Sequence, residues 1–226
     1  MSALHKELQD HNASSLVYEI ENHFIHALDQ SQRLASPYRH WLFEQALPVS
    51  IAHGLSTLPF EAPEAMTHDG RRESNNSKRI YFNRENQSRF PIISAFTKAF
   101  DGQKIRHALT VETMAHLNDA LLRVEYCQDT GDFWLEPHTD IAVKRFTMLI
   151  YLSEDKALAN CGTDIYGAAP DHALIHTAPY MFNGGLIFVP GNDTWHGFNR
   201  REIKGIRKSL IINYVGAEWR DNWELA

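Results

Sequence analysis

Apolar residues in the first part of the chain recur at the spacing of helices. The first series has members four positions apart, on one helix face: Leu16, Ile20, Phe24 and Leu28. A second helix is predicted after Pro37, through Trp41 to Ala46. A third should open at Phe90-Pro91 and end at Gly102, because Pro suits the first helical turn and Gly the residue after the last. We therefore expect residues 1–117 to be a mainly helical cover.

From about Ala120 the pattern changes to short runs rich in β-branched and aromatic residues. The runs, in order, are LLRVEYC, FWLEPH, RFTMLIYL, GTDIYG, GGLIFVP, TWHGF and RKSLIINYV. They lie too close together for crossover helices, which favours an antiparallel sandwich or barrel over a parallel α/β sheet. We expect residues 118–216 to form a β core, within one domain that spans residues 1–226.

Composition narrows the class of protein. The 226 residues are 43% hydrophobic, enough for one packed core, and no apolar run is long enough to cross a bilayer. The first residues are polar and lack the apolar segment of a signal peptide, so a cytoplasmic location is expected. The net charge of −6 argues against a nucleic-acid partner. Cys127 and Cys161 are too few for a disulfide framework, and both are predicted to be small buried side chains.

Histidine supplies the first candidate chemistry, since dinucleotide, phosphate-loop and Gly-x-Ser-x-Gly motifs are absent from the sequence. His138 and Asp140 are two positions apart, so on an extended segment their side chains share a face. Chance alone can place one such pair in a chain with 13 histidines. The case is stronger because His196 follows a later strand-and-turn run, and two imidazoles with one carboxylate suit non-haem Fe(II).

Arg207 and Ser209 form the second candidate group. Period two puts both on one face of the last predicted strand, together with Ile211. An arginine inside a β-sandwich needs an anionic partner, and that strand offers none. We therefore expect a ligand carboxylate to pair with the Arg207 guanidinium, with the Ser209 hydroxyl adding a hydrogen bond.

These motifs, taken together and in order, resemble the Fe(II)/2-oxoglutarate-dependent oxygenases, most closely the prolyl-hydroxylase-like branch. The resemblance covers roughly Leu121 to Val215. It implies a mostly β fold with N-terminal helices, in which a double-stranded β-helix (a jelly roll of the cupin type) forms the core. It also implies Fe(II), 2-oxoglutarate and O₂ as cofactor and cosubstrates, with hydroxylation of a substrate and release of succinate and CO₂.

The resemblance also assigns residues to roles. It implies that iron binds to His138, Asp140 and His196, and that the distal carboxylate of 2-oxoglutarate binds to Arg207 and Ser209. Two tyrosines match positions that often contact the cosubstrate, although core tyrosines with satisfied hydroxyls explain them equally well: Tyr126 and Tyr151.

A basic segment, residues 67–89, precedes the predicted β core. It carries six Lys and Arg residues against three Asp and Glu, in a chain of net charge −6. As a lid it would present Arg71, Arg72 and Arg79 to an anionic small molecule or side chain, with Trp134 as an apolar wall. The alternative is a solvated loop without a specific role.

Two other functions remain open at this stage. A cupin-like isomerase or binding module could hold a metal through the same three residues without 2-oxoglutarate, but would leave Arg207 unexplained. A structural protein would require the whole ordered set of motifs to be accidental.

Overall fold

The computed structural model describes residues 3–63, 70–71 and 79–226. In this part of the chain the strands form a seven-stranded major sheet and a four-stranded minor sheet, with all neighbours antiparallel. The major sheet runs, in spatial order, β1 (Gln32–Leu34), β2 (His40–Phe43), β9 (Gly185–Phe188), β6 (Lys144–Tyr151), β11 (Ile203–Val215), β4 (Leu121–Gly131) and β3 (Ile80–Tyr81). The minor sheet runs β5 (Leu135–His138), β10 (His196–Phe198), β7 (Asp164–Tyr166) and β8 (Leu174–Thr177).

From β4 to β11 the chain passes repeatedly between the two sheets. Strands β4, β6, β9 and β11 belong to the major sheet, whereas β5, β7, β8 and β10 belong to the minor sheet. This exchange produces the double-stranded β-helix that the resemblance implies, and it extends from Leu121 to Val215.

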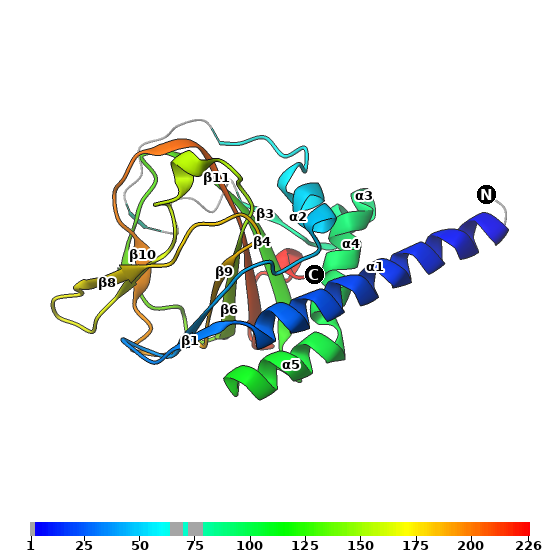
Figure 1. Cartoon of the computed structure of the whole chain (residues 1–226). Helices are drawn as coiled ribbons and strands as arrows, with labels where there is room; N and C mark the ends of the chain where they lie inside the picture. Colours follow the sequence, from blue (N-terminus) through cyan, green and yellow to red (C-terminus); the bar gives the residue numbers. More distant parts are fainter. Residues whose placement is uncertain (1–2, 64–69, 72–78) are drawn as a thin grey trace.

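The helices pack against the outer face of the major sheet, and the minor sheet lies on the opposite side (Figure 1). They are α1 (Ala3–Asp29), α2 (Val49–Ser56), α3 (Arg84–Arg89), α4 (Pro91–Asp101) and α5 (Gln103–Thr113). Two short 3₁₀ turns complete the elements, η2 (Lys156–Leu158) and η3 (Asn222–Glu224). No helix among the described residues is both long enough and apolar enough to cross a membrane.

The major sheet separates two hydrophobic clusters. Side chains of each strand alternate between the two faces of this sheet. Leu210 and Ile212 of β11 belong to the cluster on the helix side, and Leu149 and Tyr151 of β6 belong to the cluster on the side of the minor sheet. The period-two prediction for the last strand is therefore confirmed, since Arg207, Ser209 and Ile211 line a pocket on the face toward the minor sheet.

Two of the three predicted helices are confirmed. The first series of apolar residues lies on α1, and α4 begins at Pro91 with Gly102 as its C-terminal cap. The helix predicted after Pro37 is wrong. Residues 40–43 form β2, which pairs with β9 along its whole length, and the next helix starts only at Val49. An apolar tetrapeptide is compatible with either structure, and the open edge of β9 decides in favour of a strand.

The basic segment is not one continuous loop. Its last part folds as β3, which pairs with β4, and as α3, whose Asn83 cap accepts a hydrogen bond from the Asn86 amide at 3.1 Å. Both cysteines are free, with Cys161 buried as predicted but Cys127 only half-buried.

Candidate functional site

His138 and His196 lie opposite each other on neighbouring strands. His138 ends β5, and His196 begins β10 as its cross-strand partner. The centroids of the two imidazole rings are 4.4 Å apart. These residues are 58 positions apart in the sequence, and the antiparallel pairing of the minor sheet brings them together, as the sequence predicts for two members of the metal site.

The two imidazoles are held in the same way. Nδ1 of His138 is 2.8 Å from the carbonyl oxygen of Glu136, and Nδ1 of His196 is 2.9 Å from the carbonyl oxygen of Thr194. A carbonyl can only accept, so Nδ1 carries the proton in each ring and the lone pair lies on Nε2. Both rings therefore have the tautomer in which Nε2 can bind a metal.

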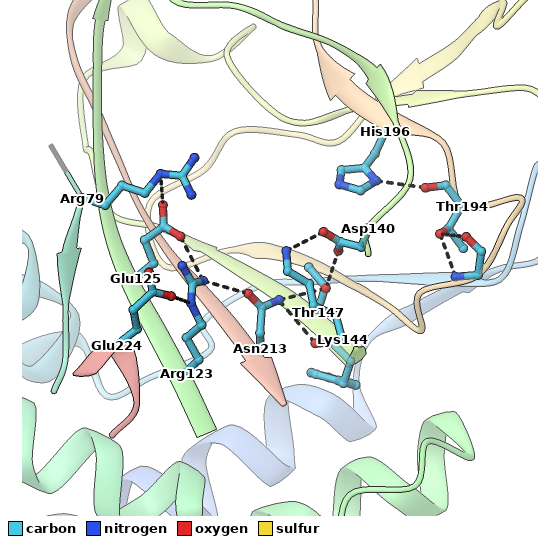
Figure 2. A network of polar contacts seen from close by, with 12 residues as sticks. Arg79, Arg123, Glu125, Asp140, Lys144, Thr147, Thr194, His196, Asn213 and Glu224 are labelled. Atoms are coloured by element: carbon cyan, nitrogen blue, oxygen red, sulfur yellow. Dashed lines mark hydrogen bonds and ion pairs between the residues drawn. The ribbon is translucent and has the colours of Figure 1, made fainter. Parts of the chain in front are cut away.

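Asp140 lies just beyond the end of β5, where strand alternation no longer orients its side chain. One carboxylate oxygen accepts a hydrogen bond from Lys144 Nζ at 2.5 Å and the other from Thr147 Oγ1 at 2.7 Å (Figure 2). The Asp140 side chain is 3% exposed and that of Lys144 6% exposed, so this ion pair is buried.

Across the described residues, no three or more His, Cys, Asp or Glu side chains are arranged to hold a metal ion. The structure thus brings together two of the three predicted ligands and holds the third, Asp140, on Lys144 and Thr147. β5 ends at His138, so Asp140 lies outside the hydrogen-bonded part of the strand.

A pocket between the two sheets, here called the inner pocket, joins the histidines to the second candidate group. Its lining includes His138, His196, Thr147, Arg207 and Ser209. Apolar side chains complete it, among them Phe133, Leu135, Leu149 and Phe198. The two groups predicted from separate motifs thus share one cavity.

Arg207 is paired within the chain. Its Nη1 is 2.5 Å from the Asp129 carboxylate, and its Nε donates to the carbonyl oxygen of Cys161 at 2.6 Å. The inference that its anionic partner must be a ligand is therefore corrected. Asp129 lies on β4, directly opposite Arg207 in the register, and a search along the arginine's own strand could not find it. Burial raises the pKa of Asp129, although Arg207 beside it acts in the opposite direction.

Ser209 is fully buried on the same face. Its hydroxyl has no hydrogen-bond partner among the described residues. A buried polar atom without a partner is unfavourable, so this hydroxyl marks a place where a ligand atom can bind.

The two tyrosines lie on opposite faces of the major sheet. Tyr126 borders the inner pocket, but its ring packs in the helix-side cluster and its hydroxyl points to the carbonyl of Ser56 at 3.4 Å. The Tyr151 hydroxyl donates to Thr163 Oγ1 at 3.0 Å. Both environments are those of core tyrosines with satisfied hydroxyls, the alternative that the sequence left open.

The predicted substrate residues are dispersed. Arg71 and Arg79 line a second cavity, here called the side cavity, which shares His138 with the inner pocket and also contains Asp140 and Lys144. Trp134 lines neither cavity, and the Arg200 guanidinium lies 4.3 Å from its ring centroid. Arg72 lies outside the described residues.

A buried polar network, not predicted from the sequence, connects the side cavity to Asp140 (Figure 2). Glu125 lies 3.0 Å from Arg79 and 3.1 Å from Arg123. The contacts continue from Arg123 through Asn213 to the Thr147 hydroxyl, which binds Asp140. The alternation of β4 signals that Arg123 and Glu125 share a face, but their partners come from other elements.

Three solved structures illustrate the similarity of this fold to known ones. A Pseudomonas putida prolyl 4-hydroxylase has 14% sequence identity and a TM-score of 0.55, over 88% of this chain and 93% of the other. A Trichoplax adhaerens prolyl hydroxylase, solved with a hypoxia-inducible-factor peptide, has 10% identity and a TM-score of 0.51, over 95% and 94%. The viral collagen prolyl hydroxylase of Paramecium bursaria Chlorella virus-1, a 2-oxoglutarate complex, has 11% identity and a TM-score of 0.51, over 79% and 96%.

No family model and no curated protein matches the sequence. The structural similarity covers most of this chain, well beyond the segment that carries the sequence motifs. The fold of this chain is therefore the double-stranded β-helix of the prolyl-hydroxylase-type Fe(II)/2-oxoglutarate oxygenases.

Proposed function

We propose that this protein is an Fe(II)- and 2-oxoglutarate-dependent oxygenase that hydroxylates its substrate. The observation that carries the proposal is the inner pocket, which contains a pair of imidazoles at one place and a buried arginine with a partnerless serine hydroxyl at another. A metal site and a carboxylate site in one cavity match a cosubstrate that chelates iron at one end and carries a carboxylate at the other.

The donor types of His138, His196 and Asp140 suit iron, although the described residues do not place all three around one point. His138 and His196 present Nε2 lone pairs from adjacent strands, since both Nδ1 atoms bind backbone carbonyls. Asp140 supplies the anionic donor of a two-histidine, one-carboxylate site.

The other end of the pocket fits a carboxylate. Arg207 supplies the positive charge, and Ser209 Oγ supplies a donor that has no partner within the described chain. The packing of Phe133, Leu149 and Phe198 around the pocket excludes water and so strengthens these polar contacts.

In the reaction, bound iron and 2-oxoglutarate supply the oxidation of a substrate C–H bond by O₂, with succinate and CO₂ as products. His138 and His196, in the tautomer set by their carbonyl partners, and Asp140, which Lys144 contacts, would hold the metal, and Arg207 with Ser209 would hold the distal carboxylate of the cosubstrate. Such positioning of reactants accounts for a large part of enzymatic rate acceleration.

The side cavity is the proposed entrance for the substrate, because its lining includes His138 and Asp140 but not Arg207. Its lining carries Arg71, Arg79, Arg123 and Lys144 against Glu136 and Asp140. Glu125 and Glu224 pair with Arg79 and Arg123 from outside this lining, so these charges balance one another. The proposal of an anionic small molecule or side chain as substrate therefore depends on the basic composition of residues 67–89. The Trichoplax adhaerens neighbour was solved with a peptide fragment, and for this chain a peptide side chain belongs to the same proposal.

One observation favours the alternative of a cupin-like metal protein that does not use 2-oxoglutarate. Arg207 has Asp129 as an internal partner, so its burial does not by itself require a ligand carboxylate.

Anaerobic titration separates the two functions. For the oxygenase we expect that Fe(II) followed by 2-oxoglutarate produces a weak metal-to-ligand charge-transfer band in the visible region, and that air then yields succinate. Asp140→Ala should lose most of its iron affinity while it keeps the wild-type circular dichroism spectrum. Iron binding without the band would support the cupin-like function, and full turnover by Asp140→Ala would refute the metal assignment.

A further inference from the structure

Three aromatic rings and a backbone carbonyl pack around the Arg207 guanidinium and fix its position. The ring centroids of Phe198, Tyr151 and Tyr180 lie 4.8, 5.8 and 5.8 Å from its central carbon. The Cys161 carbonyl holds Nε at 2.6 Å. A ligand that approaches Arg207 from the inner pocket therefore meets a fixed cation.

Asp129 belongs to the lining of the inner pocket. Its carboxylate lies 2.5 Å from Arg207 Nη1, and its side chain is 13% exposed, compared with 6% for Arg207. Asp129 lies opposite Arg207 in the register of β4 and β11, and Ser209 is two positions farther along the same face, so a carboxylate that contacts both Arg207 and Ser209 would lie close to the Asp129 carboxylate.

Two carboxylates beside one guanidinium leave an uncompensated negative charge in a buried place. The remaining charged groups that act on Asp129 are Glu125, which repels it, and Arg79, which attracts it. Arg79 is itself 3.0 Å from Glu125, so this pair offers little net compensation. Two carboxylates that approach one guanidinium in a buried pocket repel each other, and this repulsion weakens the binding of the ligand by about tenfold or more.

We infer that Asp129 is an internal competitor for the distal carboxylate of the cosubstrate and sets the affinity for it. This inference rests on the proposed function. Asp129 holds Arg207 in place when the pocket is without cosubstrate, and its negative charge opposes the incoming carboxylate. The residue acts through Arg207 and is therefore a positioning residue that lowers cosubstrate affinity.

Asp129→Asn is the variant that tests the inference, because asparagine keeps the size of the side chain and an oxygen that can accept the Arg207 N–H bond. The measurement is the dissociation constant of 2-oxoglutarate for the anaerobic Fe(II)-loaded protein, by calorimetry. We expect binding to become tighter by about tenfold or more. Asp129→Ser, a smaller neutral variant, should tighten binding in the same direction if the asparagine protein folds poorly.

A second ligand and a control variant make the result specific. 2-Oxopentanoate has the same chain length but lacks the distal carboxylate, so its affinity should change less than twofold in Asp129→Asn. Glu224→Gln removes a carboxylate that lies 2.5 Å from another buried arginine, Arg123, and it does not line the inner pocket. This control should leave 2-oxoglutarate affinity unchanged.

The outcomes are distinct. If the wild type binds 2-oxoglutarate and both Asp129 variants bind it equally or more weakly, the inference is overturned. The proposed function is unaffected by that result. An equal gain for 2-oxopentanoate would also overturn it, since the effect would not depend on the distal carboxylate. If neither the wild type nor any variant binds 2-oxoglutarate, the proposed function itself fails.

Discussion

Ser209 places a buried hydroxyl in the inner pocket without a hydrogen-bond partner in the described chain. A group that forms no internal hydrogen bond contributes little to stability, so its removal should affect ligand binding alone. Serines whose hydroxyls form hydrogen bonds within the fold should, in contrast, contribute to the free energy of unfolding.

We expect Ser209→Ala to keep the free energy of unfolding within about 0.5 kcal/mol of the wild type, which is usual for substitutions that remove no interaction. The affinity for 2-oxoglutarate should fall by about tenfold, the equivalent of one lost hydrogen bond to a charged group. Calorimetry and urea unfolding measure the two quantities. An unchanged 2-oxoglutarate affinity would exclude Ser209 from the cosubstrate site.

Ser153→Ala is the matched control. The Ser153 hydroxyl donates to the Ile206 carbonyl at 2.6 Å and accepts from the Lys208 amide at 2.9 Å. Its removal leaves both backbone groups without this partner, so we expect a loss of about 1–3 kcal/mol in unfolding free energy with little change in cosubstrate affinity.

At the scale of elements, a pair of histidines joins the two sheets. His40 belongs to β2 of the major sheet and His176 to β8 of the minor sheet, and their Nε2 atoms are 3.1 Å apart. His40 is fully buried, and its Nδ1 lies 2.8 Å from the Tyr38 carbonyl. Burial lowers the pKa of His40, and His176 beside it acts in the same direction.

This pair predicts a pH dependence of stability. Because the pKa of His40 is lower in the folded state, the unfolded chain binds the proton first as the pH falls. The contribution of His40 is therefore complete above the ordinary histidine pKa of about 6.5 and is lost progressively below it, with a limiting slope of about 1.4 kcal/mol per pH unit.

Urea unfolding between pH 7.5 and 5 measures this slope. We expect His40→Gln to flatten it, whereas His107→Gln, which changes an exposed histidine on α5, should leave it unchanged. A wild-type slope that survives in His40→Gln would assign the acid sensitivity to other groups.

At the scale of the whole molecule, Arg123 connects elements from distant parts of the chain. It lies 3.1 Å from Glu125 on its own strand and 2.5 Å from Glu224 in η3, and it donates to Tyr81 on β3 at 3.0 Å. Burial, together with Glu125, raises the pKa of Tyr81 to about 12, so its hydroxyl stays protonated. The C-terminal residues are thereby held against β3 and β4.

We expect Arg123→Met to lower the free energy of unfolding by about 3–5 kcal/mol, because it leaves the Glu224 carboxylate without its cation and Glu125 with Arg79 alone. Arg145→Met should have a much smaller effect, since its partner Asp119 is 76% exposed. Chemical unfolding of both variants measures the difference. Similar losses for the two arginines would mean that the buried network contributes no more than a surface pair.

The sequence by itself determined the features that depend on local spacing. Period-two alternation assigned Arg207 and Ser209 to one face of β11, and proline and glycine marked the ends of α4. The short apolar runs predicted an antiparallel β core, and the resemblance carried by the ordered motifs implied the double-stranded β-helix.

Only the tertiary structure decided which side chains meet. Arg207 contacts Asp129, which is 78 residues away. The Asp140 carboxylate accepts hydrogen bonds from Lys144 and Thr147, and residues 40–43 form a strand because they pair with β9. The first and last of these outcomes depend on the register between strands that are distant in the sequence, and the contacts of Asp140 depend on how the chain turns from β5 into β6. Alternation gives the face on which a side chain lies, but its partner is set by the neighbouring strand, which the local sequence does not specify.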